Sequence, residues 1–363
     1  MTIQELDTPA VIIDLDVVER NIKRLAEYCR EHGLQLRPHT KTHKNAGIAL
    51  QQMAAGACGI TVAKTGEAEV MAAAGVHDIL IAYPIVTPAK AERVARLARD
   101  SKIRVSLDSD LAAECLSAAA AAAGAEIGIL VEIDVGFGRC GVGSPADSVA
   151  LARRIGSMPG LRFDGLMFYP GHIRKPVNEQ GPMIEEVNRV LRSHYEGFAS
   201  AGIKISTVSG GSTPTAFRSH EFEGVTEIRP GMYAFLDRNM LSIGAGDTAD
   251  CAVAVLVTVV SNAVTGRAMV DGGSKTFSSD GALQPLAGYG LVLEEPAAQL
   301  IGFSEEHGHL DVSRCARAPQ VGERLRIIPN HVCATVNLHD SVWGHRGGRV
   351  ERELTVDARG RLR

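Results

Sequence analysis

A (β/α)8 TIM barrel followed by a C-terminal β-domain is the fold that the sequence predicts. Eight short apolar runs rich in β-branched residues recur through the first two thirds of the chain, separated by stretches rich in alanine, leucine and charged residues. This alternation is typical of parallel βα units, and eight such units close into a barrel. From about residue 242 onward, strand-like runs are instead separated by glycine and polar turns.

Each predicted barrel strand ends at a recognisable point. In chain order the strands are "LQLRPHT" to Thr40, "GITVA" to Ala63, "DILIAYP" to Pro84, "IRVSLD" to Asp108, "IGILVEID" to Asp134, "FDGLMFYP" to Pro170, "ISTVSGG" to Gly211 and "VTEIRPG" to Gly231. The predicted crossover helices span 44–55, 64–74, 88–99, 110–123, 144–155 and 180–201. A doubly wound open sheet is the alternative, and the lack of a GxGxxG motif after the first strand disfavours it.

The same patterns predict the domain boundaries. Residues 17–241 should form the barrel, and residues 1–16 together with 242–363 should form the β-domain. The early run "AVIIDLD" precedes the first barrel strand by a full helix over 17–31, so we predict that it joins the β-domain as a ninth strand. The β-domain's own strand-like runs are "CAVAVLVTVVSNAV", "RAMVDGGSKTF", "GERLRIIPN" and "GGRVERELTVD".

Composition excludes several classes of protein. With 363 residues, 45% of them hydrophobic, the chain can bury a large core. A formal charge of -4, without a basic stripe or tail, argues against nucleic acid and anionic lipid as partners. The acidic N-terminal stretch and the lack of an apolar run of about 20 residues predict a cytoplasmic protein. The seven cysteines, without CxxC spacing, are predicted to be reduced thiols.

The carboxyl ends of barrel strands converge on one face, where active sites form. Lys41 lies there, in "LRPHTKTHKN", with Arg37, His39 and His43 nearby. A lysine in an apolar, cation-rich setting is a candidate Schiff-base amine, with a solvated surface lysine as the alternative. The other polar strand ends carry Lys64, Tyr83, Asp108, Glu132, Asp134, Tyr169 and His172.

Three further stretches at these strand ends are suited to an anion. "SGGST", at residues 209–213 after the seventh strand, presents successive backbone N–H groups, as phosphate-binding loops do. "EIRPGMY" places Arg229 before a turn that keeps the backbone of Gly231 and Met232 close to a ligand; a structural arginine is the alternative. "GFGRCG" supplies Arg139 on a glycine-flanked loop. A lysine, a phosphate loop and two arginines together suggest pyridoxal 5'-phosphate (PLP).

The predicted β-domain carries a different signal. In "IPNHVCATVNLHD", His331 and Cys333 are two residues apart, which in a strand places both side chains on one face. Imidazole and thiolate suit zinc and leave positions open for water and substrate. A buried histidine beside a core cysteine is the alternative. His339 and Asp340 follow as either supporting groups or surface residues.

Seven motifs resemble one known family over nearly the whole chain: "DTPAVIIDLD", "LRPHTKTHK", "VEIDVGFGRCGV", "VSGGST", "PGMYAFLD", "SEEHGHL" and "PNHVCATVNLHD". They resemble the metal-dependent D-threonine aldolase and D-serine dehydratase family of PLP fold type III. The resemblance implies the alanine-racemase-like fold, in which a PLP-binding TIM barrel precedes a β-domain. It also implies a homodimer in which the partner chain completes each active site.

The resemblance also implies residue roles. Lys41 would be the Schiff-base lysine, Arg139 the partner of the cofactor's phenolic oxygen, and Tyr169 a neighbour. Our own hypothesis from the motif is that His39 and His43 tune or shield the cofactor. The implied phosphate-binding residues are Gly210, Gly211, Ser212 and Tyr233, next to Ser209 of the same loop. His331 and Cys333 would be the metal ligands, with Zn²⁺, Mn²⁺ or Mg²⁺ gripping the substrate's β-hydroxyl.

Three features depart from the aldolases of this family. His-x-Cys at the metal site is similar to the dehydratase branch, whereas the aldolases have His-x-Asp. The arginine of "IRPG" resembles alanine racemase, where arginine faces the pyridine nitrogen; several aldolases have glutamine there. "YPGHIR" offers His172 as the catalytic base, whereas the aldolases have histidines at other offsets.

The function implied is that of a PLP- and metal-dependent lyase for D-β-hydroxy-α-amino acids. We expect aldolase-type cleavage to glycine and an aldehyde; the alternative is a D-serine or D-threo-3-hydroxyaspartate dehydratase that forms an oxoacid and ammonia. An amino-acid racemase would leave His331 and Cys333 idle. A non-catalytic PLP-binding protein would typically lack the β-domain.

Overall fold

The computed structural model describes residues 1–363, which form two compact units. The barrel unit comprises Arg24–Lys41, Ala46–Gly231 and Gly360–Arg363, and the β unit comprises Met1–Lys23, Thr42–Asn45 and Met232–Arg359. The domain boundaries expected from the sequence, 17–241 for the barrel and 1–16 with 242–363 for the β-domain, stay a prediction. None of the helices combines the length and the apolar character needed to cross a membrane.

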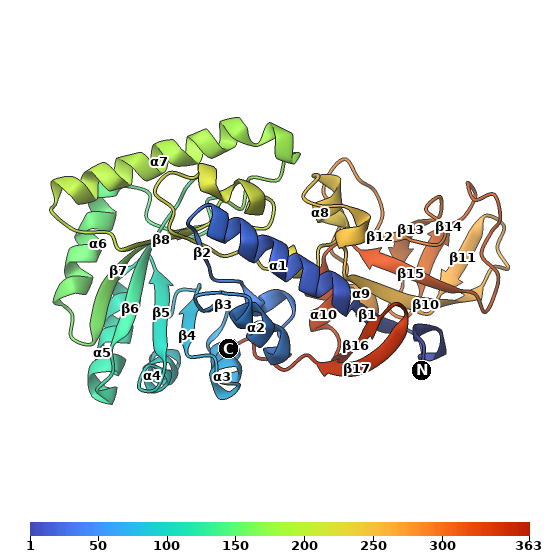
Figure 1. The fold of residues 1–363 in the computed structure, drawn as a ribbon, viewed down its shortest axis with the longest axis horizontal. Coiled ribbons are helices and arrows are strands. Elements are labelled where there is room, and N and C mark those ends of the chain that lie inside the picture. Colours follow the sequence, from blue (N-terminus) through green and yellow to red (C-terminus); the bar gives the residue numbers. More distant parts are fainter. The chain divides into compact units, whose positions relative to one another are not determined.

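The barrel unit contains eight parallel strands, as predicted (Figure 1). They are hydrogen-bonded in the order β2-β9-β8-β7-β6-β5-β4-β3, and the two ends of this order meet through a parallel bridge between His39 and Thr61. The strands are β2 (Gln35–Leu36), β3 (Ile60–Val62), β4 (Asp78–Ile81), β5 (Lys102–Leu107), β6 (Ile127–Ile133), β7 (Leu161–Phe168), β8 (Thr207–Gly210) and β9 (Glu227–Ile228).

The predicted crossover helices are all present and differ from their expected ranges by a few residues. They are α2 (Ala46–Ala54), α3 (Thr65–Ala73), α4 (Pro88–Leu97), α5 (Asp110–Ala123), α6 (Pro145–Ser157) and α7 (Gly181–Ser200). Local signals set their ends: the Ser144 hydroxyl caps α6 by accepting from the Asp147 N–H, and Gly124 ends α5 in the left-handed conformation at φ 62°. Short 3-10 helices span Thr40–Thr42, Val177–Glu179 and Ala216–Glu221.

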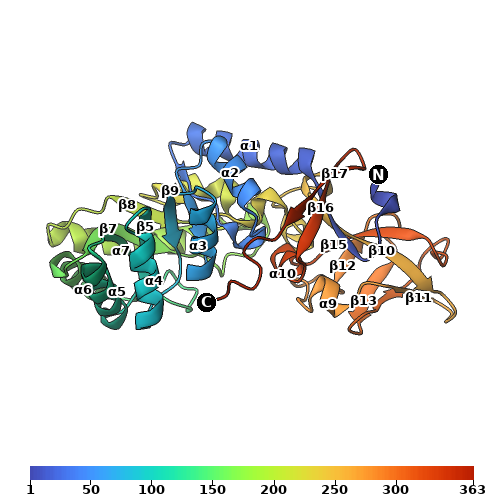
Figure 2. The same ribbon diagram turned by 90° about the horizontal axis from the view of Figure 1, so that it is seen from below.

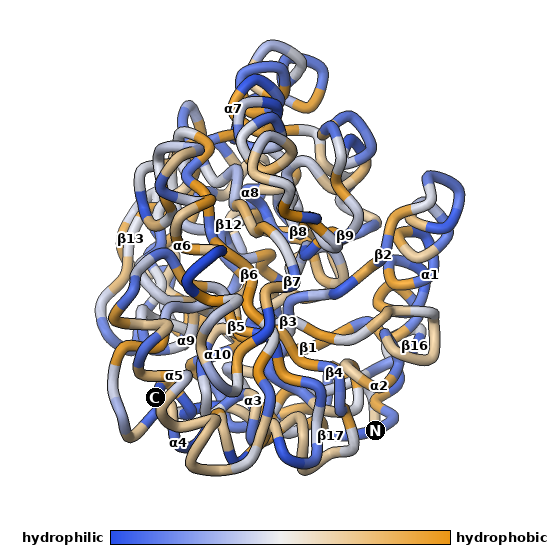
Figure 3. Tube along the Cα trace, turned by 90° about the vertical axis from the view of Figure 1, so that its left-hand side faces the viewer, coloured by the Kyte–Doolittle hydropathy of each residue, from blue (hydrophilic) through white to orange (hydrophobic).

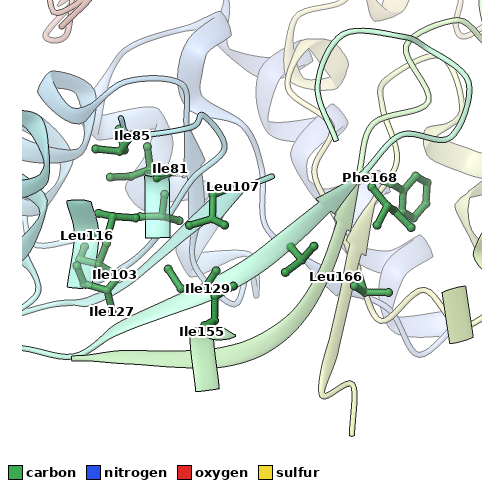
Figure 4. Packing of buried hydrophobic residues seen from close by; sticks show 14 of the residues in the cluster. Ile81, Ile85, Ile103, Leu107, Leu116, Ile127, Ile129, Ile155, Leu166 and Phe168 are labelled. Carbon is green, nitrogen blue, oxygen red and sulfur yellow. The ribbon is translucent and has the colours of Figure 1, made fainter. Parts of the chain in front are cut away.

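The main core of the barrel unit lies between the sheet and the surrounding helices. Figure 4 shows Ile103, Ile127 and Ile129 of the strands packing with Leu116 of α5 and Ile155 of α6. All of these side chains are almost fully buried, because the strands of a parallel barrel are covered on both faces. In Figure 3 the hydrophobic colours accordingly concentrate in strands such as β6 and β7.

The β unit is built on a nine-stranded sheet in the order β11-β14-β13-β12-β15-β10-β1-β16-β17. An additional pairing of β11 with β10 closes six of these strands into a ring. Figure 2 shows the chain from below, with β10, β11, β12, β13, β15, β16 and β17 of this sheet labelled. They are β1 (Ala10–Asp14), β10 (Val253–Ser261), β11 (Arg267–Val270), β12 (Gly290–Val292), β13 (Gln299–Phe303), β14 (Gly308–Asp311), β15 (Arg324–Pro329), β16 (Ser341–Arg346) and β17 (Arg349–Thr355).

The prediction that "AVIIDLD" joins the β-domain is confirmed. Strand β1 pairs antiparallel with β10 and parallel with β16, so it lies inside the sheet of the β unit. It leads into α1 (Leu15–Glu31), the helix predicted over 17–31. The remaining helices of the β unit are short: α8 (Arg238–Ser242), α9 (Ser274–Phe277), α10 (Val332–Asn337), and the 3-10 helices Ile3–Glu5, Met232–Ala234 and Thr248–Asp250.

A buried histidine in the barrel unit makes the stability depend on pH. His194 of α7 is fully buried; its Nδ1 lies 2.9 Å from the Ser148 hydroxyl, and its Nε2 has no partner. Burial lowers the pKa of His194 to about 4. Because the unfolded ring titrates near 6.5, the unfolded state binds the proton first, and stability falls as the pH drops from about 6.5 toward 4.

We therefore expect the free energy of unfolding to fall by about 2 kcal/mol between pH 7.5 and pH 5 through His194 alone. Urea unfolding at both pH values, compared between the wild type and His194→Gln, measures this contribution. The variant should lose that part of the pH dependence. His307→Gln, at an exposed position, is the control and should retain it.

Candidate active site

A cluster of polar side chains forms where β6, β7 and β9 end. Arg139 lies in the loop after β6, and its guanidinium carbon is 4.6 Å from the centroid of the Tyr169 ring, just after β7. The ring of Phe137 meets Tyr169 edge-on, with centroids 5.4 Å apart. Arg139 also lies 3.8 Å from the Glu132 carboxylate, the distance joining NH2 and Oε1. The structure thus brings together two residues predicted from separate motifs, Arg139 and Tyr169.

Arg229 supplies a buried cation to the same strand ends. Its NH2 group donates to the Phe168 carbonyl at 2.7 Å, whereas its Nε has no hydrogen-bond partner. Burial lowers the pKa of Arg229, and the carboxylates of Glu132 and Glu227 oppose that shift. Burial likewise raises the pKa of Glu132, opposed by Arg229 and Arg139. Buried N–H groups normally have an acceptor, and the chain provides none for the Arg229 Nε, so this group is suited to donate to a ligand.

The loop after β8 offers a row of unpaired backbone donors. The N–H groups of Gly211, Ser212 and Thr213 are all on buried residues, and none has an acceptor within the chain. Gly211 adopts φ +85°, which turns the chain so that successive N–H groups can face one concavity. Gly210 is needed for packing, because a Cβ there would lie 2.1 Å from the Phe168 ring. Such a row suits a phosphate dianion.

Ser209 is oriented differently from the rest of this loop. Its hydroxyl donates to the buried Glu227 carboxylate at 2.7 Å. The Ser209 hydroxyl is therefore already hydrogen-bonded to a residue of β9 and is not one of the loop's unpaired donors.

Lys41 is the exposed member of an otherwise buried segment. It sits in the 3-10 helix Thr40–Thr42, and its backbone N–H lies 3.4 Å from Nδ1 of His39. His39 and Thr40 are buried against β3, since His39 bridges Thr61 and the Thr40 hydroxyl donates to the Thr61 carbonyl. The segment is therefore fixed while the Lys41 side chain remains accessible.

Arg37, in contrast, does not contribute free positive charge near Lys41. It is buried; its Nε donates to Glu227 at 2.7 Å and its NH1 to Asp78 at 2.6 Å. Asp78 is the first residue of β4, so the guanidinium points away from the carboxyl ends of the strands. The expected cation-rich setting for Lys41 is wrong in this respect, because two carboxylates neutralise Arg37.

His172 follows β7 and lies against Gly136 of the loop after β6. Its Nδ1 is buried and has no hydrogen-bond partner. This ring nitrogen is therefore available to form a hydrogen bond with a ligand.

The predicted cofactor-binding residues 231–233 lie on both sides of the boundary between the two units. Gly231 is the last residue of its segment in the barrel unit, while Met232 and Tyr233 belong to a 3-10 helix of the β unit.

In the β unit, the expected strand at His331 and Cys333 is wrong. Strand β15 ends at Pro329, His331 is the N-cap of α10, and Cys333 lies in the first turn. The two side chains nevertheless lie close enough to interact, and the interaction with Cys333 is the main cause that raises the pKa of His331 to about 9.

Further side chains surround this pair. His331 Nδ1 lies 2.5 Å from Asp280 Oδ2, and Cys333 Sγ lies 3.1 Å from the Thr42 hydroxyl, to which it donates. Buried Asp237 accepts from the Val332 and Met240 N–H groups, and burial raises its pKa to about 6. No group of three or more His, Cys, Asp or Glu side chains converges as a ready metal site. Imidazole and thiol as a pair do fit a divalent ion that keeps open positions.

His339 and Asp340, which follow α10 and its C-cap Leu338, have different contacts. His339 Nε2 lies 3.0 Å from the Thr276 carbonyl, so it ties the end of the segment to α9. Asp340 is exposed and pairs with Arg359. Sequence reasoning missed Asp280, Thr42 and Asp237; the available signals were that Thr42 follows Lys41 directly and that Asp237 ends the motif "PGMYAFLD".

Comparison with known proteins agrees over the full length. Two family models match: the alanine racemase N-terminal domain over residues 13–239, and a putative serine dehydratase domain over residues 252–344. The D-threonine aldolase of Arthrobacter sp. is 36% identical over 98% of this chain and 93% of its own length. The chain belongs to the D-threonine aldolase and D-serine dehydratase family.

Two further members of this family span both units. D-threo-3-hydroxyaspartate dehydratase of Delftia sp. (strain HT23) is 36% identical over 92% of this chain and 93% of that protein. The crystal structure of D-threonine aldolase from Filomicrobium marinum matches with a TM-score of 0.92 at 34% identity, covering 99% of this chain and 98% of that one. The predicted family, its alanine-racemase-like fold and its lyase class are thus confirmed.

Beneath the cluster at the strand ends, Glu227 joins several strands of the barrel. It is buried and accepts from Arg37 of the β2 segment and from Ser209 of β8. Glu227→Gln should lower the free energy of unfolding by about 3–5 kcal/mol, because it removes the more deeply buried of the two carboxylates that neutralise Arg37. Urea unfolding measures the loss.

The matched control is Glu223→Gln. This exposed carboxylate pairs with Arg192, so its change should stay within about 1 kcal/mol. Equal effects of the two substitutions would contradict a structural role for the buried pair.

Proposed function

We propose that this protein is a PLP- and metal-dependent lyase that cleaves D-β-hydroxy-α-amino acids into glycine and an aldehyde. The observation that carries the proposal is the set of unpaired buried donors in the barrel unit. The Gly211, Ser212 and Thr213 amides and the Arg229 Nε await acceptors, in the unit that also holds an accessible lysine, Lys41. The aldolases among the full-length relatives support the choice of reaction.

The residues of the barrel unit fit PLP. The three amides after β8 suit its phosphate, and the side chain of Ser212 lies in the same loop. The Arg229 Nε can donate to the pyridine nitrogen, and Arg139, held over Tyr169, can donate to the phenolic oxygen. The Lys41 amine would form the Schiff base with the aldehyde of the cofactor. When bound, the cofactor joins the amino acid through that aldehyde and takes up the electron pair released at Cα.

His172 and the side chains around α10 complete the assignment. The unpartnered Nδ1 of His172 can take the β-hydroxyl proton of the substrate, after which the Cα–Cβ bond breaks and the aldehyde departs. A proton returned to Cα then gives glycine. His331 and Cys333 would hold the divalent ion, Zn²⁺, Mn²⁺ or Mg²⁺, which supplies polarisation of the β-hydroxyl.

Cys333 favours a second candidate, dehydration of D-serine or D-threo-3-hydroxyaspartate. The His-x-Cys pair matches the pattern expected for the dehydratase branch, and the Delftia relative carries that activity in its name. In this reaction Lys41 removes the α-proton and the β-hydroxyl leaves as water. Hydrolysis of the resulting enamine gives the oxoacid and ammonia, so water is neither gained nor lost overall.

We also propose a cytoplasmic homodimer in which the partner chain completes each active site. All seven cysteines are free thiols, which suits a reducing compartment. Neither nucleic acid nor membrane is proposed as a partner, since the formal charge is -4 and no basic tract is present.

Replacement of the lysine tests the cofactor assignment. Lys41→Ala should abolish the absorbance of the lysine-bound cofactor at the short-wavelength end of the visible range. It should also abolish activity, because no other amine takes the position of Lys41. Lys64→Ala is the matched control: Lys64 follows β3, its Nζ lies 3.5 Å from the centroid of the Tyr83 ring, and the variant should keep the absorbance. An unchanged spectrum in Lys41→Ala would refute the assignment.

Product analysis separates the two reactions. The pure protein is incubated with D-threonine, D-phenylserine, D-threo-3-hydroxyaspartate and D-serine, with and without a chelator. We expect glycine plus an aldehyde, and loss of that activity with the chelator or in His331→Ala. An oxoacid plus ammonia would establish the dehydratase instead, whereas racemisation that survives chelation would overturn both.

A further inference from the structure

We propose that Asp280 is a positioning residue that orients the imidazole of His331 for the divalent ion. The inference rests on the proposed function, because it assumes that His331 and Cys333 hold that ion. It adds a residue from outside their sequence motif, 51 positions away from His331.

The direct contact sets the tautomer of the ring. Asp280 Oδ2 lies 2.5 Å from Nδ1 of His331. A carboxylate oxygen accepts, so Nδ1 donates to Asp280, and Nε2 is the ring nitrogen whose lone pair serves a metal when the ring is neutral. A carboxylate behind a ligating histidine fixes both the orientation of the ring and its basicity. Cys333, the other proposed ligand, lies in the first turn of the helix that His331 caps.

Asp280 is held in place by the residue next to His331. The buried Asn330 side chain donates to the Asp280 carbonyl at 3.2 Å and to the Gly288 carbonyl at 2.9 Å. Asn330 therefore contacts the backbone of Asp280, and the next residue, His331, contacts its carboxylate. This double contact distinguishes the pair from an incidental surface ion pair, whose two long side chains have to be ordered by the pair itself.

The loop that carries Asp280 is anchored from α8 as well. The Arg238 NH1 donates to the Asn330 Oδ1 at 3.1 Å, and its NH2 donates to the Ala287 carbonyl at 2.9 Å. The Leu283 N–H donates to the Asn239 side chain at 2.8 Å. A segment without regular structure is thus tied at several points, which allows a side chain on it to hold a fixed position.

The test measures metal affinity directly. Full-length PLP-loaded protein is stripped with a chelator and titrated with Co²⁺, whose absorption reports coordination by a thiolate. Asp280→Ala should raise the dissociation constant for Co²⁺ about 10–100-fold, and Asp280→Asn should raise it less. At saturating Co²⁺ both variants should regain the wild-type kcat, because Asp280 acts through His331 and does not contact the substrate.

Asp311→Asn is the matched control and should bind Co²⁺ like the wild type. Asp311 is a partly exposed carboxylate of the same unit that pairs with Arg267 and Ser313. If Asp280→Ala and Asp280→Asn both bind within twofold of the wild type, while His331→Ala loses binding, the positioning role is overturned and the metal site stands. If the wild type gives no thiolate band and His331→Ala changes nothing, the metal assignment itself fails, and the positioning role with it.

Discussion

The buried ion pair between Arg37 and Glu227 is the interaction on which the barrel unit depends most. Strands β2 and β9 are only two residues long, so few backbone hydrogen bonds join them. The Arg37 guanidinium spans this short pairing and also reaches Asp78 of β4, while Ser209 of β8 donates to the same Glu227. The β2 segment, β9, β8 and β4 are thereby joined by one buried cluster of charged side chains. The candidate site lies at the carboxyl ends of β2, β8 and β9, which are among these strands.

This arrangement explains why the chemistry collects where it does. The segment that follows β2 carries Lys41, the loop after β8 carries the unpaired amides, and the turn after β9 carries Arg229. Because each of these lies within a few residues of a strand fixed by Glu227, their relative positions depend on the ion pair underneath. Buried donors without acceptors cost free energy, and a ligand that accepts from them recovers it.

In the β unit, the proposed metal ligands are positioned by different contacts. His331 and Cys333 lie at the start of a helix, where a buried carboxylate, Asp237, accepts from the N–H of the residue between them. The outer contacts come from distant parts of the unit: Asp280 reaches His331 and Thr42 reaches Cys333. Each proposed ligand therefore has a hydrogen-bonding partner that limits its rotation before any ion arrives.

Sequence reasoning predicted the elements correctly, since they depend on local signals. Alternating apolar runs and helical periodicity lie within windows of ten to twenty residues, so all eight barrel strands and their crossover helices could be predicted. The pattern also marks the strand ends that Lys41, Arg139, Arg229 and the loop after β8 follow, whereas the roles of these residues stay predictions. The failure at residues 331–333 was also local: the two-residue spacing of His331 and Cys333 was interpreted as a strand, whereas the chain begins a helix there.

Only the tertiary structure decided which side chains meet. Arg37 and Glu227 are 190 positions apart, and Cys333 and Thr42 are 291 apart, so no local pattern could pair them. The sequence by itself determined the fold, the family and the residue types available for PLP and metal. The structure decided that Arg37 is neutralised below the strand ends, that Arg229 keeps a free donor, and that Asp280 stands behind His331. The physical reason is that hydrogen bonds and ion pairs depend on distance in space, which for residues so far apart in the chain is set only when the strands pack.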